Sequence, residues 1–330
     1  MGQVLTSGLG MNTARQVALN SGMQLSSFAY VVNQVCGSGM RATMDGSSKI
    51  YSGESDLLIV GGQESMSRAR HAYLSRTGEK KLGNNVFIDT LVNDGLTDAF
   101  SKEHMGITAE NVSRRYTVTR QDQDQFAYQS YLKTYKAIKN NYFKNELIKS
   151  TYKDEVRKDT TLVKLGKLKA VFKKSGTVTA GNASSLNDGA SFLALASEKY
   201  IKSNKIRPIA KILSWASSAG NPDYMGVTPI TAIQKLMKKM GVNIGYFDLV
   251  EINEAFAATS VAVQRSLKID PNKLNIAGGA IALGHPIGCS GARIVTTLAH
   301  QLRRTKQKVG VASMCIGGGQ GLAIAIEKLN

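Results

Sequence analysis

The 330-residue chain has only three cysteines and no long apolar run, and each scarcity excludes a class of protein. The cysteines form no CxxC pair, and their odd number leaves at least one thiol unpaired, which favours a reducing cytoplasm over an oxidising exterior. No stretch approaches the roughly 18 apolar residues that a membrane helix requires, so no membrane association is predicted. The first residues lack the basic and apolar regions of a signal peptide, so we expect a cytoplasmic protein.

Signatures of common ligands are also missing. The chain has no Walker A sequence, no clean GxGxxG after a strand, and no paired short spacing of cysteines or histidines, so neither a nucleotide cofactor nor a metal site is predicted. The formal charge is +18, which favours anionic partners. Because no nucleic-acid-binding module is recognisable, we expect no nucleic-acid partner and interpret the lysine-rich stretch 133–174 as a solvated surface.

What the chain does contain is a pattern that occurs twice. A glycine turn leads into a helix in VCGSGMRATMDG and again in GHPIGCSGARIVTTL, with Ser38-Gly39 matching Ser290-Gly291. The first copy continues into a predicted strand at Asp56–Val60 and a predicted turn at Gly61-Gly62. The repeat predicts two similar α/β halves, with strands covered by helices. The polar text from about 68 to 186 is interpreted as an inserted, mostly helical subdomain.

Cys36 is the first candidate for chemistry. It follows the β-favouring run Tyr30–Val35 and precedes a helix, so we expect it at a helix N-terminus. The helix dipole contributes about 0.3–1 kcal/mol, whereas one pKa unit corresponds to about 1.36 kcal/mol, so a second group must activate the thiol. His285 is the candidate, because an imidazole beside sulfur can hold the thiolate as an ion pair. A buried structural thiol and a hydrogen-bonded core imidazole are the alternatives.

Three further features belong with this pair. Small residues surround His285 in GGAIALGHPIGCSG, which lets a substrate approach the backbone closely. Cys315 ends an apolar strand and enters a glycine turn, whose N–H groups either face an oxyanion or only connect two strands. Asn253 follows the predicted strand Phe247–Ile252, where it either orients a water or caps the next helix. Ligands in open α/β sheets bind beyond the carboxyl ends of strands, so chemistry is expected there.

Together, several stretches in fixed order resemble the thiolase family, from near the first residue to the last: NQVCGSGM, GGQESMS, DGLTDAF with HMGITAEN, GTVTAGNASSLNDGA, EINEAFA, GGAIALGHPIGCSGAR and SMCIGGGQG. Bacterial biosynthetic members are the most similar. The resemblance implies a thiolase-like α/β fold, with two similar halves in layers of helices and sheets (αβαβα) and an inserted helical loop subdomain. The expected domains are an N-terminal half at 1–67 and 187–207, the insertion at 68–186, and a C-terminal half at 208–330.

The resemblance also implies roles for single residues. Cys36 would be the nucleophile that becomes acylated, His285 its activator, and Cys315 the acid/base for the second acetyl group. Asn253 would hold a water that forms one oxyanion hole with His285, and the N–H groups of Cys36 and Gly317 would form the other. The pocket for coenzyme A would be lined by Ser184, His104, Met105, Leu96, Arg157, Phe256 and Met225.

The implied activity is ping-pong condensation of two acetyl-CoA molecules into acetoacetyl-CoA and CoA through acyl-Cys36, and the reverse thiolysis. No metal or other cofactor is implied, and a homo-oligomer, either a dimer or a homotetramer, is expected. The alternatives are a degradative 3-ketoacyl-CoA thiolase of broader chain length and an inactive thiolase-like protein.

The chain departs from the family pattern in four places. Family members carry a strand and a helix ahead of the segment that starts here at Met1, and loss of an interior strand would expose unpaired backbone and apolar surface on its neighbours. The connection at 149–154 is shorter than usual. Ser185 replaces a glycine and Cys289 replaces an alanine near the substrate path, which bears on substrate preference rather than on reaction type.

Overall fold

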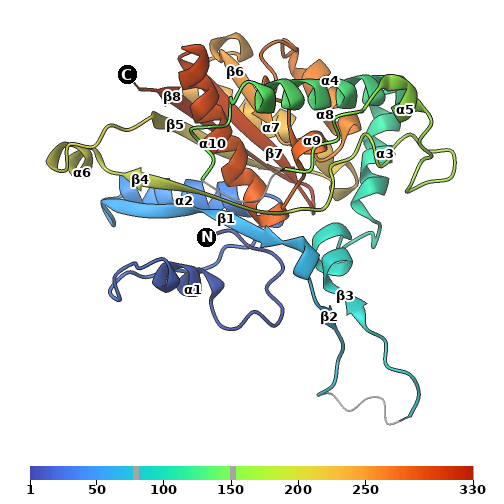
Figure 1. Ribbon diagram of the computed structural model, residues 1–330, viewed down its shortest axis with the longest axis horizontal. Helices are drawn as coiled ribbons and strands as arrows, with labels where there is room; N and C mark the ends of the chain where they lie inside the picture. Colours follow the sequence, from blue (N-terminus) through green and yellow to red (C-terminus); the bar gives the residue numbers. More distant parts are fainter. Residues whose placement is uncertain (77–81, 149–153, 330) are drawn as a thin grey trace.

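Two sheets enclose a layer of two helices in the computed structural model, which describes residues 1–76, 82–148 and 154–329 (Figure 1). The central helices, α2 (Ser38–Tyr51) and α10 (Ile287–Thr305), pack against each other. On one side lies the antiparallel pair of β1 (Leu57–Ser65) and β4 (Asp188–Ala196). On the other side lies a four-stranded sheet of β5 (Ala210–Ala219), β8 (Gln320–Lys328), β7 (Val309–Ile316) and β6 (Leu249–Ile252), in that order.

Outer helices complete the layers. α7 (Thr228–Met240) packs on the four-stranded sheet, on the face away from α10, and α1 (Thr13–Asn20) lies on the outer side of β1 (Figure 1). In the larger sheet only β6 and β7 are parallel. The order helix, sheet, helix, sheet, helix confirms the predicted αβαβα layering.

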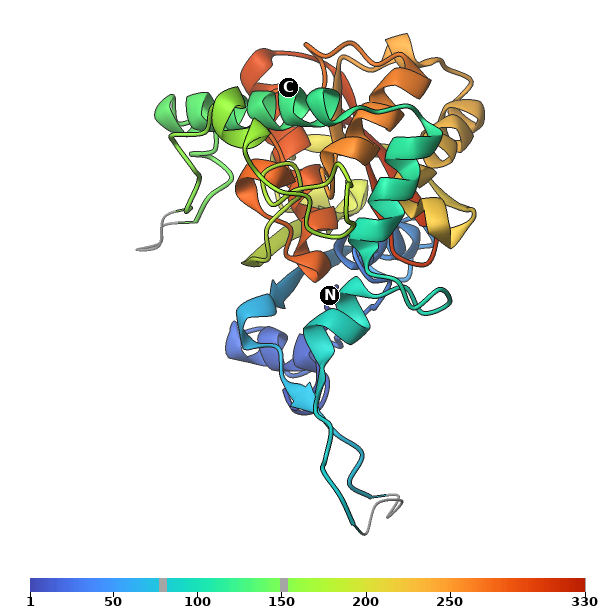
Figure 2. The same ribbon diagram turned by 90° about the vertical axis from the view of Figure 1, so that its right-hand side faces the viewer.

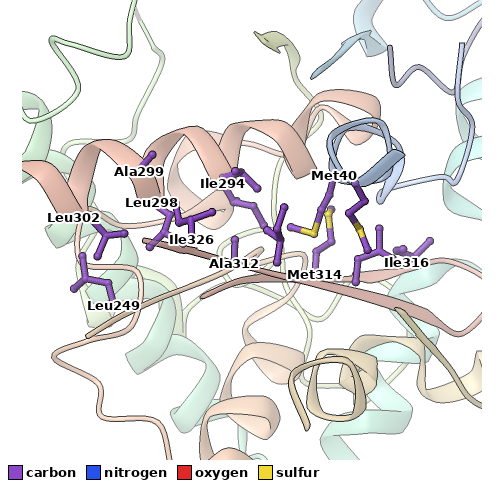
Figure 3. Close-up of a cluster of buried hydrophobic side chains, with 14 residues drawn as sticks. Met40, Leu249, Ile294, Leu298, Ala299, Leu302, Ala312, Met314, Ile316 and Ile326 are labelled. Atoms are coloured by element: carbon purple, nitrogen blue, oxygen red, sulfur yellow. The ribbon is translucent and has the colours of Figure 1, made fainter. Parts of the chain in front are cut away.

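The main core lies between α10 and the larger sheet (Figure 3). Ile294, Leu298 and Leu302 recur every four residues along α10, so they share one face, and that face packs on the strands. α2 adds Met40 to the same cluster. Each fully buried side chain of this size stabilises the fold by about 1.5–3 kcal/mol relative to an exposed one. β7 is buried along its whole length because helices cover both of its faces.

α2 and α10 cross at backbone contact, at the two glycines that the sequence repeat aligns. A Cβ added to Gly39 would lie 2.9 Å from Ala292 N, and a Cβ added to Gly291 would lie 2.4 Å from Met40 N. Because a side-chain carbon does not fit so close to a neighbouring backbone, only glycine lets the helices approach this far. The repeated Ser-Gly pair therefore marks the place where the two halves of the molecule meet.

The structure corrects three local predictions. The turn predicted at Gly61-Gly62 is wrong, because β1 continues through it to Ser65; Gly62 is needed instead for a close approach, since its Cβ would lie 1.9 Å from Gly288 O. The run Tyr30–Val35 makes only isolated bridges rather than a strand. The helix after Asn253, α8 (Ala257–Leu267), begins four residues later, which leaves a connecting loop after β6.

β1 has a partner strand along one edge only. Within the described residues its other edge is bridged at Gly62 alone, by Gly2. On this strand Leu57 and Ile59 are 43% and 50% exposed, and an apolar groove of about 310 Å³ lies between β1 and α1.

The segment predicted as a mostly helical insertion is less helical than expected, because long irregular connections separate its helices in the described parts. A short hairpin extends away from the rest of the molecule in both views (Figures 1 and 2). The elements of the whole segment are β2 (His71–Ala72), β3 (Ile88–Asp89), η2 (Leu91–Leu96), α3 (Met105–Arg115), α4 (Arg120–Lys139) and α5 (Leu162–Gly166), and β2 and β3 form the hairpin. The domain boundaries stay a prediction, and the shortened connection at 149–154 lies, apart from its last residue, outside the described residues.

Short elements complete the chain. They are η1 (Met66–Arg68), α6 (Glu198–Ser203), η3 (Pro222–Val227), η4 (Ile244–Tyr246) and α9 (Ala280–Leu283). In the part of the chain that the structure describes, no helix combines the length and the apolar character that crossing a membrane demands.

Candidate active site

Cys36 and His285 occupy equivalent places, each two residues before one of the crossing helices. The turn that carries Cys36 is strained, because Val35 has φ 44°, a left-handed conformation that costs a β-branched residue about 1–3 kcal/mol. Ser38 holds this turn, since its hydroxyl donates to Val35 O at 2.6 Å and accepts from Gln34 N at 2.9 Å. Enforced strain of this kind is typical of functional sites.

The sulfur of Cys36 faces two backbone donors. Burial raises the pKa of this thiol to about 11, although the N–H groups of Gly317 and of Cys36 itself act in the opposite direction. Gly317 lies on the turn after β7, so one donor comes from the C-terminal half and the other from the N-terminal half. These are the two N–H groups predicted to form an oxyanion hole, and the structure brings them to the same sulfur.

The thiolate–imidazolium pair predicted for Cys36 and His285 stays a prediction, because burial favours the neutral form of each group in this site. Burial, with a smaller contribution from Arg293, lowers the pKa of His285 to about 4. A thiol with a raised pKa and an imidazole with a lowered pKa are both neutral near pH 7, because desolvation disfavours charge on either group. Both residues are described, and no hydrogen bond joins their side chains. Catalytic hydrogen bonds often form only when substrate is bound.

Two polar side chains hold the His285 ring. Asn253 Nδ2 lies 3.4 Å from Nε2, and Ser290 Oγ lies 2.6 Å from Nδ1. Asn253 follows β6, and its N–H donates to Ser313 O at 3.0 Å. Its amide oxygen is buried and has no partner among the described residues. Because an unsatisfied buried acceptor costs about 1–3 kcal/mol, this oxygen fits the predicted role of binding a water.

Cys315 lies on β7, one residue before the strand ends. Since β6 and β7 run parallel, Asn253 and Cys315 reach the same edge of the sheet. Burial raises the pKa of Cys315 to about 12, and the nearby Cys36 adds to this effect. The thiols of Cys36 and Cys315 thus lie close together. The paired Asn253 and His285 lie after β6 and before α10.

Most of the residues predicted to bind coenzyme A surround Cys315. Met105, Met225 and Phe256 form one buried cluster with it. Ser184 lies beside this cluster, because its N–H and its hydroxyl both donate, at 3.0 Å, to the carbonyl that precedes Phe256. The acid/base candidate therefore lies within a buried apolar cluster, where its sulfur is shielded from bulk water.

His104 joins this cluster through an aromatic residue that the sequence analysis missed. Phe172 stacks on the His104 ring at 4.6 Å between ring centroids and meets the Phe256 ring edge-on at 6.2 Å. The available signal was Phe172 itself, the single aromatic residue in the basic stretch KLGKLKAVFKK. Gly106 carries the same information, since a Cβ there would lie 2.2 Å from the Phe172 ring.

Two residues predicted to bind coenzyme A, Leu96 and Arg157, lie outside the buried cluster around Cys315. Leu96 ends η2, directly before the bridge between Thr97 and His104. Arg157 lies on an exposed loop before α5, where its charge lowers the pKa of Tyr131 against the larger effect of burial. The structure does not bring Arg157 into the buried cluster.

Behind Asn253 lies a group of buried charges. Burial raises the pKa of Glu251 on β6 to about 8; Arg293 and Lys133 oppose this effect, and Glu254 and Glu146 add to it. Burial also raises the pKa of Glu146 to about 7, although the Thr297 hydroxyl donates to it at 2.8 Å. Arg293 favours the charged forms of both Glu251 and Glu146, but burial has the larger effect. The fold therefore favours the neutral forms of these two carboxyl groups.

We expect Glu251→Gln to flatten the dependence of stability on pH. Above the unfolded-state pKa of about 4.3, the folded protein binds more protons at Glu251 than the unfolded chain, so the free energy of unfolding falls as pH rises toward about 8. The neutral amide removes this penalty, and the variant should lose less Tm than the unmodified protein between about pH 5.5 and pH 8. Calorimetry measures both slopes, with surface Glu103→Gln as the control. Equal slopes for Glu251→Gln and the unmodified protein would contradict the prediction.

Comparison with known proteins places the chain in a family. Two family models match it, the thiolase N-terminal domain over residues 1–199 and the thiolase C-terminal domain over residues 206–328. The acetyl-CoA acetyltransferase of Rhizobium meliloti (strain 1021) is 45% identical over 340 residues, covering 100% of this chain and 86% of the relative. The acetyl-CoA acetyltransferase of Shinella zoogloeoides is 46% identical, with the same coverage.

Solved structures agree with the sequence relatives. The crystal structure of the Bacillus anthracis acetyl-CoA acetyltransferase has a TM-score of 0.95 and 39% identity, covering 100% of this chain and 86% of that one. Human mitochondrial 3-ketoacyl-CoA thiolase in complex with CoA also has a TM-score of 0.95, with 40% identity over 99% of this chain and 84% of that one. With family models over nearly every residue, relatives above 40% identity and the same fold, the chain belongs to the thiolase family.

Proposed function

We propose that this protein is an acetyl-CoA C-acetyltransferase that condenses two acetyl-CoA molecules into acetoacetyl-CoA and CoA, and catalyses the reverse thiolysis. The observation that carries the proposal is the proximity of the Cys36 and Cys315 thiols at a buried apolar cluster, with the His285–Asn253 pair at the adjacent strand and helix ends. The names of the relatives support the choice of acetyl-CoA. No further cofactor enters this scheme, because both reacting groups arrive as thioesters.

In the first half-reaction Cys36 becomes acylated. As its sulfur attacks the acetyl carbonyl carbon, the thiol proton moves to the neutral His285 ring, and the negative carbonyl oxygen accepts from the N–H groups of Cys36 and Gly317. The C–S bond to coenzyme A then breaks. The departing thiolate takes the proton of Cys315, whose raised pKa keeps it a thiol at rest. CoA leaves, and Cys315 remains as a thiolate beside protonated His285.

In the second half-reaction a carbon–carbon bond forms. The Cys315 thiolate removes a proton from the methyl group of a second acetyl-CoA, and the enolate oxygen is stabilised by His285 and by a water on Asn253. The enolate carbon attacks the acyl carbon, and the bond to Cys36 sulfur breaks. That sulfur recovers its proton from His285, so protons and charges balance over the cycle.

We expect Cys315→Ala to separate the two half-reactions. Without this thiol the departing CoA lacks its proton donor, so acylation of Cys36 should be slow but measurable, whereas condensation should fail because no base faces the second methyl group. Labelling with radioactive acetyl-CoA follows the first step, and formation of acetoacetyl-CoA follows the second. Normal condensation by the variant would disprove the acid/base role.

The acyl-chain length of the substrate distinguishes the proposed function from a second candidate, a degradative 3-ketoacyl-CoA thiolase. The degradative alternative is favoured by one observation, the equal TM-score of the human 3-ketoacyl-CoA thiolase. Thiolysis rates for the four-carbon substrate and for longer 3-ketoacyl-CoAs discriminate the two functions, and we expect a preference for four carbons. A folded protein without turnover on any of these substrates would indicate the inactive alternative.

Two coarser features accompany the proposal. The three cysteines are free thiols, which supports a reducing, cytoplasmic location. We also expect a homo-oligomer, which sedimentation measures directly.

A further inference from the structure

Glu64, the penultimate residue of β1, is a buried carboxylate without a basic partner. It is 3% exposed and forms no ion pair within the residues described. Three backbone N–H groups bind it instead: Leu5 N donates to Oε1 at 3.1 Å, and Val4 N and Gly288 N donate to Oε2 at 3.0 Å each. A buried carboxylate needs several such donors, because burial without hydrogen bonds is costly.

The three donors come from two parts of the chain: one packs beside Cys36, and the other directly follows His285. Val4 and Leu5 belong to a small apolar cluster that packs against Cys36. Gly288 is the second residue of α10, so the carboxylate also lies at a helix N-terminus, where the dipole favours negative charge. One side chain therefore ties the surroundings of the thiol to the first turn of α10.

That first turn determines where the His285 ring lies. His285 precedes α10 by two residues, and its Nδ1 lies 2.6 Å from the hydroxyl of Ser290 within the same turn. The backbone of Gly288 lies so close to β1 that no side chain fits between them. A Cβ on Gly288 would lie 2.7 Å from Glu64 Oε2 and 2.5 Å from Gln63 O. The second glycine of GHPIG is thus explained by close packing against Gln63, Glu64 and Gln3.

The charge of Glu64 also reaches the nucleophile. Burial is the main reason that the pKa of Cys36 is raised, and Glu64 is the acidic residue that adds to it. The groups that oppose this effect are the N–H groups of Gly317 and Cys36, as described above. The pKa of Cys289 on α10 is raised to about 12 by burial, with Glu64 again contributing and Arg293 opposing.

We propose that Glu64 is a positioning residue for the reaction, which holds the first turn of α10, and with it His285, at a fixed place relative to Cys36. The proposal rests on the proposed function and deepens it. Glu64 does not touch the substrate in this scheme; it acts through His285. A displacement of about 1 Å at a catalytic group costs about 100-fold in rate, so loss of this tie should be visible in kcat.

The test compares Glu64→Gln with Glu64→Asp. The amide keeps the size but places an NH₂ group toward backbone donors, and the shorter acid keeps the charge but no longer reaches Gly288 N. Both variants should lose about 10- to 100-fold in kcat for acetoacetyl-CoA thiolysis while KM changes less than about threefold, because the pocket around Cys315 is untouched.

A second readout needs no turnover. The pH profile of Cys36 alkylation by iodoacetamide, followed by peptide mass spectrometry, should move to lower pH in Glu64→Gln and stay in place in Glu64→Asp. Glu110→Gln is the matched control, since Glu110 is also buried and accepts from Thr177 N and Val178 N. It should lower Tm without moving the profile.

The outcomes are distinct. Unchanged kcat in both Glu64 variants, or an alkylation profile that Glu64→Gln leaves in place, would overturn the positioning role. If the unmodified protein shows no thiolysis at all, the proposed function fails, whereas the alkylation comparison still tests whether Glu64 acts on Cys36. A loss of Tm alone, with both readouts unchanged, would show that Glu64 is merely structural.

Discussion

Cys36→Ser should abolish labelling by radioactive acetyl-CoA and lower thiolysis by about 10³-fold or more, the size of effect seen when a nucleophile is removed. The hydroxyl is a weaker nucleophile than the thiol, and the neutral His285 ring, whose pKa is about 4, is a poor base for it. The two backbone donors at this position would remain, so substrate binding should change little. Acyl-enzyme formation and steady-state thiolysis measure the two effects separately.

Cys289→Ser is the matched control for this variant. Cys289 is another buried thiol, on the first turn of α10, and it has no part in the proposed chemistry. Labelling should persist in the control and disappear in Cys36→Ser. Label that remains on Cys36→Ser would remove the nucleophile assignment, and with it the covalent mechanism.

Gly291→Ala should destabilise the protein by about 1–3 kcal/mol or more, the range for overpacking a tight interior. The new methyl group would lie 2.4 Å from Met40 N and 2.7 Å from Met40 Cβ. Backbone cannot move aside as a flexible side chain can, so α2 and α10 must separate. Because Cys36 and His285 precede these helices, activity should fall even in the fraction that folds. Calorimetry and thiolysis at a temperature below the transition measure both losses.

Gly166→Ala is the control for a glycine in a helix without close neighbours. Gly166 ends α5, and a Cβ there would have no heavy atom within 4 Å. Alanine favours a helix over glycine by about 1 kcal/mol, so this change should be neutral or stabilising. A Tm for Gly291→Ala equal to that of Gly166→Ala would show that the helix crossing tolerates a side chain and that its close approach is not required.

Residue type and local spacing carry much of the information about the candidate site. A thiol before a helix, a histidine among small residues and a second thiol at a strand end were each recognisable from a few neighbouring letters. The repeated Ser-Gly pair at Ser38-Gly39 and Ser290-Gly291 marks the positions where α2 and α10 approach closely. Local spacing did not reveal Phe172, because stacking on His104 depends on contact between segments that are distant along the chain.

The features that the sequence-based predictions did not capture have a common physical cause. The glycines at Gly61-Gly62 were interpreted as a turn, although the close approach of α10 explains Gly62. The ion pair of Cys36 and His285 was inferred from the ability of an imidazole to hold a thiolate, whereas burial is the largest influence on both pKa values. Burial and backbone approach are properties of the packed molecule, and no short stretch of sequence encodes them alone.

The amino-acid sequence by itself determined the family and the layered α/β architecture, and it predicted the reactive groups, because these follow from side-chain chemistry and from periodic patterns along the chain. The tertiary structure alone decided how those groups are held: neutral at rest through desolvation, joined by the crossing of α2 and α10, and tied together by the carboxylate of Glu64. Such features arise only where distant segments come into contact and exclude water.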